Sequence, residues 1–329
     1  MEQVDNMRIV VTGAAGYIGS NVCVQLLDRG YEVIGVDRNL KALYALPAEV
    51  IKYGYDVCSP MIDEPMFRAG KVDACIHLAA DISVPESMTA PMKYYHNNVF
   101  GSMNTIQACM RHGVDKFLFS STAAVYGNGN GIPLKETDKT SPINPYGKSK
   151  LMVEVMINDA MMSGTIKMCS LRYFNVVGND PQQRVVDRSW KTKSNLFPSC
   201  MRTILGISGP LSVYGKDYST ADGTALRDYI HVSDLAKAHI DALESDLTGT
   251  FNIGIGQTYS VSQVIEEFRL QGHALPYEFH DRRDGDPEQL CSDSSSLKHR
   301  TSWLPQYRLS DMVRHYTNMI ERINEQATQ

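Results

Sequence analysis

The sequence lacks an excess of basic residues. It has 32 lysines and arginines against 37 aspartates and glutamates, which gives a formal net charge of -5 at pH 7. A protein that binds nucleic acid or an anionic membrane needs a basic surface to neutralise the phosphates. We therefore expect neither partner, and any phosphate group must be bound locally by a few side chains or backbone amides.

The sequence also lacks an uncharged run of the roughly 18 residues that a membrane span requires. Residues Met1 to Asn6 are polar and do not have the basic and apolar pattern of a signal segment. The seven cysteines are scattered and are never spaced as Cys-x-x-Cys, which argues against a disulfide framework and against a zinc site. We expect a cytoplasmic protein with reduced, buried thiols and no metal.

The sequence does contain a regular alternation of short apolar runs and helical segments. Hydrophobic residues make up 43% of its 329 residues, enough for a substantial core. Alternating strands and helices are typical of right-handed βαβ units, which build a parallel sheet covered on both faces. We predict an α/β fold with a doubly wound, Rossmann-type parallel sheet. The expected strands cover residues 8–12, 32–36, 72–78, 117–120 and 168–171, with helices at 94–111 and 147–162 among those between them.

The alternation stops after residue 175. Residues 181–194 are polar and irregular, and residues 210–224 are rich in Gly, Tyr and Asp. A helix-like segment at 232–243 and a strand-like segment at 251–253 then indicate that the chain returns to the sheet. We predict two interleaved domains: a dinucleotide-binding domain of residues 1–175, joined by 226–256, and a smaller sugar-nucleotide-binding domain of residues 176–225 and 257–329.

The first expected strand leads into a glycine-rich turn with Gly13, Gly16 and Gly19, and this turn opens the first helix. Glycine allows a tight turn, a close approach of backbone amides to a pyrophosphate, and close packing of helix on strand. Asp37 ends the second strand, where a carboxylate can accept hydrogen bonds from the adenosine ribose and repel a 2′-phosphate. We therefore predict NAD, although Arg38 is a counter-signal in favour of NADP.

Tyr146 and Lys150 lie four residues apart and thus on one face of the helix that begins here. Such a pair is usually an ordinary surface feature. Here, however, it follows a strand whose end presents hydroxyls, the last of them Thr122. A nearby ammonium and a cationic nicotinamide ring both favour the tyrosine phenolate, so Tyr146 is expected to exchange a proton with a substrate hydroxyl or ketone.

Four segments resemble the UDP-glucose (UDP-galactose) 4-epimerase family of the extended short-chain dehydrogenase/reductase superfamily. They are Ser120 to Gly127 (SSTAAVYG), Asn144 to Lys150 (NPYGKSK), Arg172 to Asn175 (RYFN) and Asp222 to Val232 (DGTALRDYIHV). The resemblance implies an isomerase that interconverts UDP-galactose and UDP-glucose through a transient 4-keto sugar, with tightly bound NAD and no net oxidation. It also implies a homodimer formed by the two methionine-containing helices at 97–111 and 149–162.

The same resemblance assigns roles to individual residues. It makes Thr122 the bridging hydroxyl, Tyr146 the acid/base and Lys150 its electrostatic partner. The cofactor-binding residues that it implies, beyond the glycines and Asp37, are Tyr17, Ile18, Asn39, Asp56, Val57, Leu78, Ala79, Ala80, Asn97, Tyr146, Lys150 and Phe174. The implied substrate-binding residues are Thr122, Asn175, Asn195, Leu196, Ser212, Val213, Tyr214, Arg227, Tyr229, Arg283, Asp286 and Leu290. The two arginines suit a diphosphate, which needs charge-assisted donors; the plainer alternative is surface pairing with the adjacent Asp228 or Asp284.

Two features limit the resemblance. Residues 179–194 lack the family's His- and Gly-rich pattern, so no contacts can be transferred to them. Leu290 occupies the position that controls room for an N-acetyl group, and its intermediate size leaves a UDP-N-acetylglucosamine or dual-specificity epimerase open. A 4,6-dehydratase is disfavoured because Ala123-Ala124 follows Thr122 where that enzyme needs Asp-Glu. Reductases that release their cofactor and a non-catalytic NAD-binding regulator are the remaining alternatives.

Overall fold

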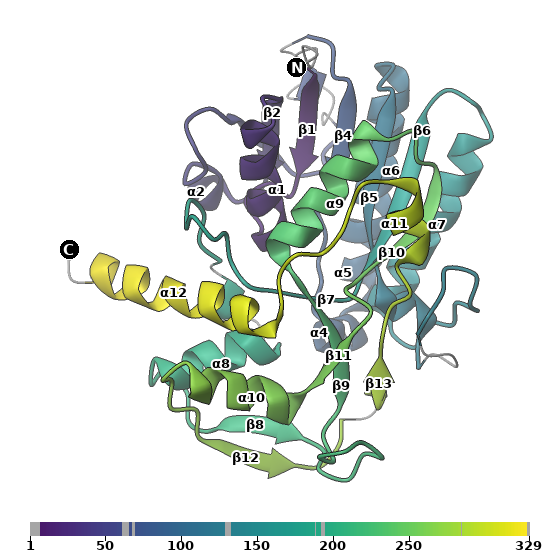
Figure 1. Cartoon of the computed structure of the whole chain (residues 1–329). Coiled ribbons are helices and arrows are strands. Elements are labelled where there is room, and N and C mark those ends of the chain that lie inside the picture. Colours follow the sequence, from purple (N-terminus) through teal and green to yellow (C-terminus); the bar gives the residue numbers. More distant parts are fainter. Residues whose placement is uncertain are drawn as a thin grey trace.

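The computed structural model describes residues 7–60, 66–67, 70–128, 133–187, 189–191, 195–283 and 285–327, with side chains up to residue 320. Two lobes are visible (Figure 1). The upper lobe in that view contains one large sheet covered by helices, and the lower lobe contains smaller sheets and further helices.

The large sheet has seven strands in the order β10-β6-β5-β4-β1-β2-β3, and every neighbouring pair is parallel. Its strand order reverses between β1 and β4, and in doubly wound sheets a ligand binds in the crevice at such a reversal. This architecture confirms the predicted Rossmann-type fold. The strands are β1 (Arg8–Thr12), β2 (Glu32–Asp37), β3 (Ile51–Gly54), β4 (Ala74–His77), β5 (Lys116–Thr122), β6 (Lys167–Tyr173) and β10 (Gly249–Ile253).

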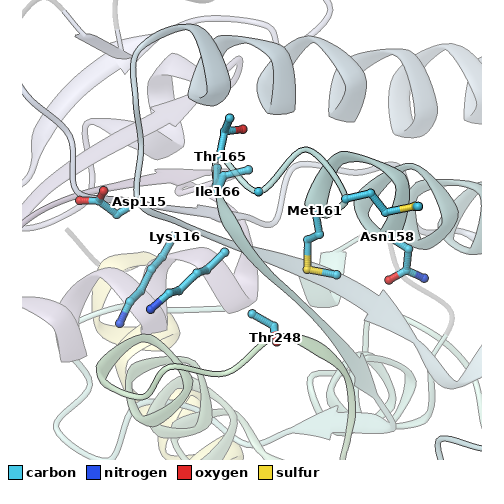
Figure 2. Close-up of a pocket in the computed structure, with 10 residues that line it drawn as sticks. Asp115, Lys116, Asn158, Met161, Thr165, Ile166 and Thr248 are labelled. Carbon is cyan, nitrogen blue, oxygen red and sulfur yellow. The ribbon is translucent and has the colours of Figure 1, made fainter.

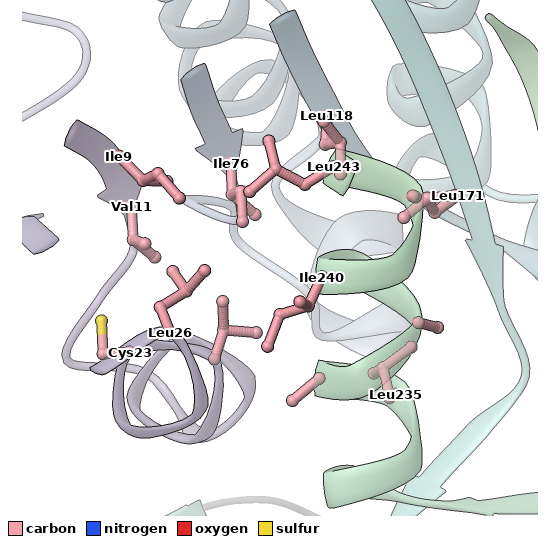
Figure 3. Close-up of a cluster of buried hydrophobic side chains, with 14 of the residues drawn as sticks. Ile9, Val11, Cys23, Leu26, Ile76, Leu118, Leu171, Leu235, Ile240 and Leu243 are labelled. Atoms are coloured by element: carbon pink, nitrogen blue, oxygen red, sulfur yellow. The ribbon is translucent and has the colours of Figure 1, made fainter. Parts of the chain in front are cut away.

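Helices cover both faces of this sheet. On one face, α1 (Tyr17–Asp28) and α9 (Val232–Glu244) pack on alternate side chains of the strands. Figure 3 shows Leu26 of α1 and Ile240 of α9 meeting Ile76 and other strand residues in this cluster. On the other face, α6 (Gly101–Arg111) and α7 (Pro145–Met161) enclose a second buried cluster that contains Phe117 and Phe119. The strands are nearly continuous apolar runs because both of their faces are buried.

One helical segment contains a local irregularity. The helix predicted at residues 94–111 is a run of α5 (Pro91–Tyr94), a π-helical segment η1 (Tyr95–Phe100) and α6. Segments of π-helix occur frequently at functional sites, and this one contains Asn97. The other short elements of the upper lobe are α2 (Leu40–Leu43), α4 (Val84–Thr89) and the 3-10 helix η2 (Ala123–Tyr126).

The lower lobe surrounds a third buried cluster, which contains Phe197, Phe268 and Tyr316. Most of its elements were not predicted from the sequence. Its strands are β7 (Asn175–Val177), β8 (Leu211–Tyr214), β9 (Leu226–His231), β11 (Thr258–Ser260), β12 (Tyr277–His280) and β13 (Gln289–Leu290). Its helices are η3 (Ser189–Lys191), α8 (Leu196–Ile204), α10 (Val261–Leu270) and α12 (Leu309–Ala327).

The chain crosses between the lobes more often than the domain prediction supposed. β9 pairs with β7, β11 and β13 and not with the large sheet, so the return to the upper lobe begins at α9. A second return follows β13: α11 (Ser295–Arg300) packs on β10, and Trp303 is fully buried in the upper cluster (Figure 1). We propose that the first return to the upper lobe begins at residue 232 and not at residue 226. We also propose that the chain returns a second time near residue 291, within the segment 257–329 that was predicted as part of the smaller domain.

Candidate active site

The glycine-rich turn brings the ends of β1, β4 and α1 into contact. Gly13 has a φ of +71°, and a Cβ built there would lie 2.7 Å from the backbone nitrogen of Ala79. A Cβ on Gly19 would lie 2.1 Å from the carbonyl oxygen of Gly13. Both contacts involve backbone that cannot move aside. The two glycines therefore let the turn form a close cradle at the N-terminus of α1, directly at the strand-order reversal, where the helix dipole favours a pyrophosphate.

Asp37 lies beside this cradle at the end of β2. Its carboxylate accepts hydrogen bonds from the backbone amides of Ala15 (3.0 Å) and Asn39 (2.8 Å). Burial raises the pKa of Asp37, while those two hydrogen bonds oppose the shift. Arg38, the counter-signal in the sequence, donates to Asp81 (2.9 Å) and Asn97 (3.2 Å). Its guanidinium is engaged with the carboxyl side of β4 and with η1, which favours a carboxylate-bound ribose and hence NAD.

The π-helical segment η1 connects the loop after β4 to α7. Asn97 is buried and donates to Asn98 (3.1 Å), which in turn donates to the hydroxyl of Ser149 on α7 (3.1 Å). Asn98 also exchanges hydrogen bonds with the backbone of Asp81, which follows β4. These contacts fix α7 relative to the loop after β4, where Leu78, Ala79 and Ala80 are partly exposed.

Tyr146 lies in the first turn of α7. Asn144 caps this helix by accepting a hydrogen bond from the backbone amide of Gly147 (2.8 Å), and Pro145 occupies the first turn, where proline is favoured. Burial raises the pKa of Tyr146, and a hydrogen bond with Thr122 lowers it. A bond that lowers the pKa favours the phenolate, so the structure brings together the hydroxyl and the phenol that the sequence predicted as partners.

Lys150 lies one turn further along α7 and is 2% exposed. Its ammonium donates to the carbonyl oxygen of Ser120 (2.8 Å) and lies 4.8 Å from the centre of the Phe119 ring. Burial lowers its pKa to about 7, and the carboxylate of Glu154 opposes this shift. The neighbouring Lys148 is exposed. Tyr146, one turn earlier on α7, is half-buried. A positive charge on Lys150 and a negative charge on Tyr146 would each favour the ionised form of the other.

The residues predicted to hold the diphosphate lie at one end of the lower lobe. Arg227 on β9 is 8% exposed and forms an ion pair with Asp286. Arg283 stacks over the Tyr214 ring at 3.7 Å and lowers the pKa of that phenol. The partner of Arg227 is therefore Asp286 and not the adjacent Asp228. The alternative for Arg283 involved Asp284, which lies outside the described residues.

Two of the predicted substrate-binding side chains belong to the core. Tyr229 is 3% exposed and packs against Phe197, and Val213 is 1% exposed in the same cluster. Along their strands both alternate with residues that face the other way. The resemblance covers whole segments of sequence, and it therefore assigned buried and exposed residues of a strand alike. Their side chains support the site from below. The partly exposed neighbours Ser212 and Tyr214 on β8 and Asn175 on β7 are better placed for contact, as are Asn195 and Leu196 at the start of α8.

A small apolar cluster lies next to the end of β5, where Thr122 is located. It consists of Ala123, Val125, Tyr126, Leu134 and Phe174, with the partly buried Leu290 packed against it. Leu290 thus borders a cluster that contains Ala123, which directly follows Thr122, and Phe174, which directly precedes Asn175. This contact places the residue expected to control substrate size next to the catalytic strand.

Some predicted residues have additional structural roles. The hydroxyl of Tyr17 donates to the carbonyl oxygen of Gly178 (2.6 Å) and so connects α1 to the lower lobe. Asp56 accepts a hydrogen bond from the amide of Cys58 (2.9 Å). Val57 is buried against Gly101, where a Cβ would lie 2.7 Å from its Cγ2. Ile18 packs on the upper cluster, and Asn39 caps α2.

A pocket of about 780 Å³ lies elsewhere, at the amino ends of β5 and β6 (Figure 2). Lys116, Met161 and Thr248 are among its lining residues. β5 begins at Lys116 in this pocket and ends at Thr122 in the candidate site, so the two lie at opposite edges of the sheet. Ligands of doubly wound sheets bind at the carboxyl edge, and we therefore assign the chemistry to the Thr122 side.

Comparison with known proteins agrees with this geometry. Residues 9–254 match the model of the NAD dependent epimerase/dehydratase family. The chain belongs to this family. It is 42% identical to a UDP-glucose 4-epimerase of Azospirillum brasilense over 93% of this chain and 90% of the relative. A second UDP-glucose 4-epimerase, from Bacillus subtilis, is 38% identical over 93% of this chain and 94% of the relative.

Solved structures of family members are similar over nearly their whole length. A UDP-glucose-4-epimerase from Stenotrophomonas maltophila with bound NAD and formylated UDP-arabinopyranose has a TM-score of 0.93 and 34% identity, covering 97% of this chain and 99% of that one. A UDP-glucose 4-epimerase from Bifidobacterium longum with NAD+ and UDP has a TM-score of 0.89 and 33% identity, covering 96% and 98%. The predicted family, the NAD cofactor and the isomerase class are confirmed.

Proposed function

We propose that this chain is a UDP-glucose 4-epimerase that interconverts UDP-galactose and UDP-glucose. The observation that carries the proposal is the placement of Thr122, Tyr146 and Lys150 at the carboxyl edge of β5, beside a glycine cradle that fits NAD. The identity of 35–42% to curated UDP-glucose 4-epimerases over most of the chain supports it.

The residues of the chain supply proton transfer and orientation. When bound, NAD supplies the acceptor, and later the donor, of the hydride at sugar C4. Tyr146 takes the proton of the C4 hydroxyl as the ketone forms and returns it when the opposite configuration is made. Thr122 donates to the phenolate oxygen, and Lys150 stabilises it electrostatically. Ala123 and Ala124 carry no acid or base for a subsequent elimination, so the reaction ends in epimerisation.

We propose that Arg227 and Arg283 bind the diphosphate. In the structure each has a partner that a phosphate could replace or extend: Asp286 for Arg227 and the Tyr214 ring for Arg283. Forked, charge-assisted donors suit two adjacent phosphates. The uridine would then lie toward β8 and the start of α8, where Asn195 and Leu196 are accessible.

A coupled assay tests the activity directly. Purified protein is incubated with UDP-galactose without added NAD, and UDP-glucose is detected with a dehydrogenase specific for it. Formation of UDP-glucose is expected, and mass spectrometry of the denatured protein should detect released NAD. A non-catalytic NAD-binding regulator would release NAD but form no UDP-glucose, and that result would refute the proposal. Turnover of UDP-N-acetylglucosamine in the same assay tests the size limit at Leu290.

We also propose that the protein is a homodimer. Apolar side chains are exposed on the surface formed by α4, α5 and α7: Met88, Met92, Met152, Val155 and Met162 are between 46% and 86% exposed. A patch of this kind on one surface marks an interaction site. Light scattering at micromolar concentration should give twice the monomer mass of 36.7 kDa, and a monomer at that concentration would refute the dimer.

Among the described residues, no helix is long and apolar enough to cross a membrane. The seven cysteines are all unpaired, and six of them are buried. Unpaired thiols are typical of a reducing compartment, and we propose on this basis that the protein is cytoplasmic. Fractionation of cells that express it tests this location, and recovery outside the cytoplasm would refute it.

A further inference from the structure

Three residues of α7 follow one another at intervals of four and therefore share one face of the helix: Tyr146, Lys150 and Glu154. Each is hydrogen-bonded to a different residue at the end of β5. Tyr146 pairs with Thr122, Lys150 donates to the carbonyl of Ser120, and Glu154 accepts from the hydroxyl of Ser121. The pair of Glu154 and Ser121 thus connects α7 to β5 in the same way as the first two pairs. No role for Glu154 was predicted from the sequence.

Glu154 is 3% exposed and is held by a second partner, Arg172 on β6. The guanidinium donates twice to its carboxylate, at 2.9 and 2.6 Å. Arg172 also donates to the hydroxyl of Tyr126 (2.8 Å), which donates to the Asn252 side chain on β10 (2.7 Å). The carboxylate is thus fixed from two strands, with every hydrogen bond inside the protein.

A buried ion pair of this kind is expensive for the fold. The desolvation of two charges often exceeds their mutual attraction, and apolar side chains of similar volume frequently stabilise a fold as well or better. Stability therefore explains the pair poorly. Glu154 differs from other buried carboxylates because it lies one helical turn from Lys150. Without a nearby negative charge, this buried ammonium would lose its proton more easily.

The charged groups around Lys150 leave Glu154 as the carboxylate that acts on it. From β4, His77 faces the lysine, but burial and the lysine itself lower the pKa of His77 to about 3, so it is neutral. From α7 itself come Tyr146 and Glu154, and from β6 come Arg172, already paired with Glu154, and Tyr173, whose hydroxyl bonds His239. Among the described residues, Glu154 is the group that holds the lysine pKa up against burial.

We propose that Glu154 is a positioning residue for the reaction at Tyr146: it keeps Lys150 protonated and fixes α7 against β5, while Arg172 holds its carboxylate in place. This inference rests on the proposed epimerase function. Loss of the carboxylate would lower the pKa of Lys150, so that less of it is charged at neutral pH. The phenolate of Tyr146 then loses a stabilising charge, and its ionisation moves to higher pH.

The experiment uses the NAD-loaded enzyme and the variant Glu154→Gln. Two readouts are followed against pH: kcat for UDP-galactose, and the phenolate absorbance of Tyr146, obtained by subtracting the spectrum of the corresponding Tyr146→Phe protein. We expect the midpoint of both curves to rise by about one pH unit, which is about a tenfold loss of kcat below the midpoint. KM should change less than about twofold. Glu154→Asp keeps the charge, and both midpoints should therefore stay close to those of the unmodified enzyme.

Tyr126→Phe is the matched control, because it weakens the same network and leaves the carboxylate in place. It should lower the melting temperature without moving either midpoint. If Glu154→Gln does not fold, Ser121→Ala, which removes one bond to the carboxylate, should still raise the midpoint measurably. The proposal is overturned if the midpoint of a folded Glu154→Gln or Ser121→Ala enzyme stays within about 0.2 unit of the unmodified enzyme, or if Tyr126→Phe moves it equally.

The two readouts separate this inference from the proposed function. If the enzyme forms no UDP-glucose but Glu154→Gln still shifts the phenolate absorbance, the epimerase function is wrong and the role of Glu154 stands. If the enzyme is an active epimerase and the absorbance does not shift, the epimerase function stands and the proposed role of Glu154 is wrong.

Discussion

At the scale of single residues, the site depends on two groups that burial alone would leave uncharged. Burial raises the pKa of Tyr146 and lowers that of Lys150 to about 7. Neither group is a good catalyst in isolation, because each prefers its neutral form. The hydrogen bond from Thr122 and the charge of Glu154 oppose these tendencies. The ionisation of Tyr146 is therefore a property of the cluster and not of the tyrosine alone.

Tyr146→Phe removes the proton acceptor and retains the ring. Turnover of UDP-galactose should fall roughly 10²- to 10⁴-fold, the usual contribution of a general acid/base. Bound NAD, measured after denaturation, should stay at the level of the unmodified protein. Tyr44→Phe is the control, because Tyr44 is 69% exposed and lies at the end of α2, outside the cluster of Thr122, Tyr146 and Lys150, and it should leave turnover unchanged. A Tyr146→Phe enzyme with more than about a third of normal turnover would contradict the assignment.

The neighbouring arginines 282 and 283 offer a matched pair for the diphosphate. Arg283→Ala should raise KM for UDP-galactose roughly 10- to 100-fold, since a charge-assisted hydrogen bond is worth about 1.5–3 kcal/mol. Arg282 pairs with Asp217 and stacks on Tyr218, so Arg282→Ala should change KM less than about threefold. Steady-state kinetics on both variants make the comparison. Equal effects of the two would contradict the assignment to Arg283.

At the scale of elements, the turn between β1 and α1 is the most constrained part of the site. A Cβ at Gly19 meets the backbone of Gly13 at 2.1 Å, so Gly19→Ala must displace the N-terminus of α1. We expect this variant to lose its NAD while the sheet remains folded, as judged by NAD content and circular dichroism. Gly209→Ala is the control, because a Cβ there meets nothing within 4 Å. Retention of full NAD content in Gly19→Ala would show that the turn is not the pyrophosphate site.

The sequence predicted elements whose signals are local. The glycine turn, the helix that begins near Tyr146, and six of the seven strands of the large sheet each depend on residues close together in the chain; β3 was not predicted. Contacts between residues that are distant in the chain could not be predicted in this way. Nothing near Arg227 in the sequence indicates that Asp286, 59 positions later, is its partner instead of Asp228. Burial of Tyr229 and Val213 likewise depends on Phe197 and other residues of distant helices.

At the scale of the whole molecule, buried polar groups hold the lobes together. Asp228 is fully buried on β9, where its carboxylate accepts hydrogen bonds from the amides of Ile255 (2.9 Å), Gly256 (3.0 Å) and Ser292 (3.0 Å). These residues follow β10 and β13, so one side chain connects the end of the large sheet to the lower lobe. Such a connection has no motif, and the second return of the chain to the upper lobe was accordingly not predicted from the sequence.

The stability of the molecule should depend on pH through three buried histidines. Burial lowers the pKa of His77 to about 3, of His231 to about 3 and of His239 to about 4. Between these values and the unfolded pKa of about 6.5, the unfolded chain binds more protons than the folded one. Stability therefore falls as pH decreases through this window, by up to about 1.4 kcal/mol per pH unit for each histidine. Asp234, whose pKa burial raises to about 6, opposes one of them below pH 6.

Urea unfolding at a series of pH values from 7 to 4.5 measures this effect. The free energy of unfolding should be highest near pH 7 and should decrease steadily toward pH 4.5. A free energy that stays constant or rises on acidification would contradict the neutral, buried state of these histidines.

The central claim is that hydride leaves and returns to C4 of the same sugar while Tyr146 handles the proton. The most direct measurement uses UDP-galactose that carries deuterium at C4, converted by the enzyme in ordinary water and analysed by mass spectrometry and NMR. The claim predicts UDP-glucose that retains the deuterium at C4, and almost no product from Tyr146→Phe. UDP-glucose that has lost its deuterium, or no UDP-glucose from the unmodified enzyme, would contradict it.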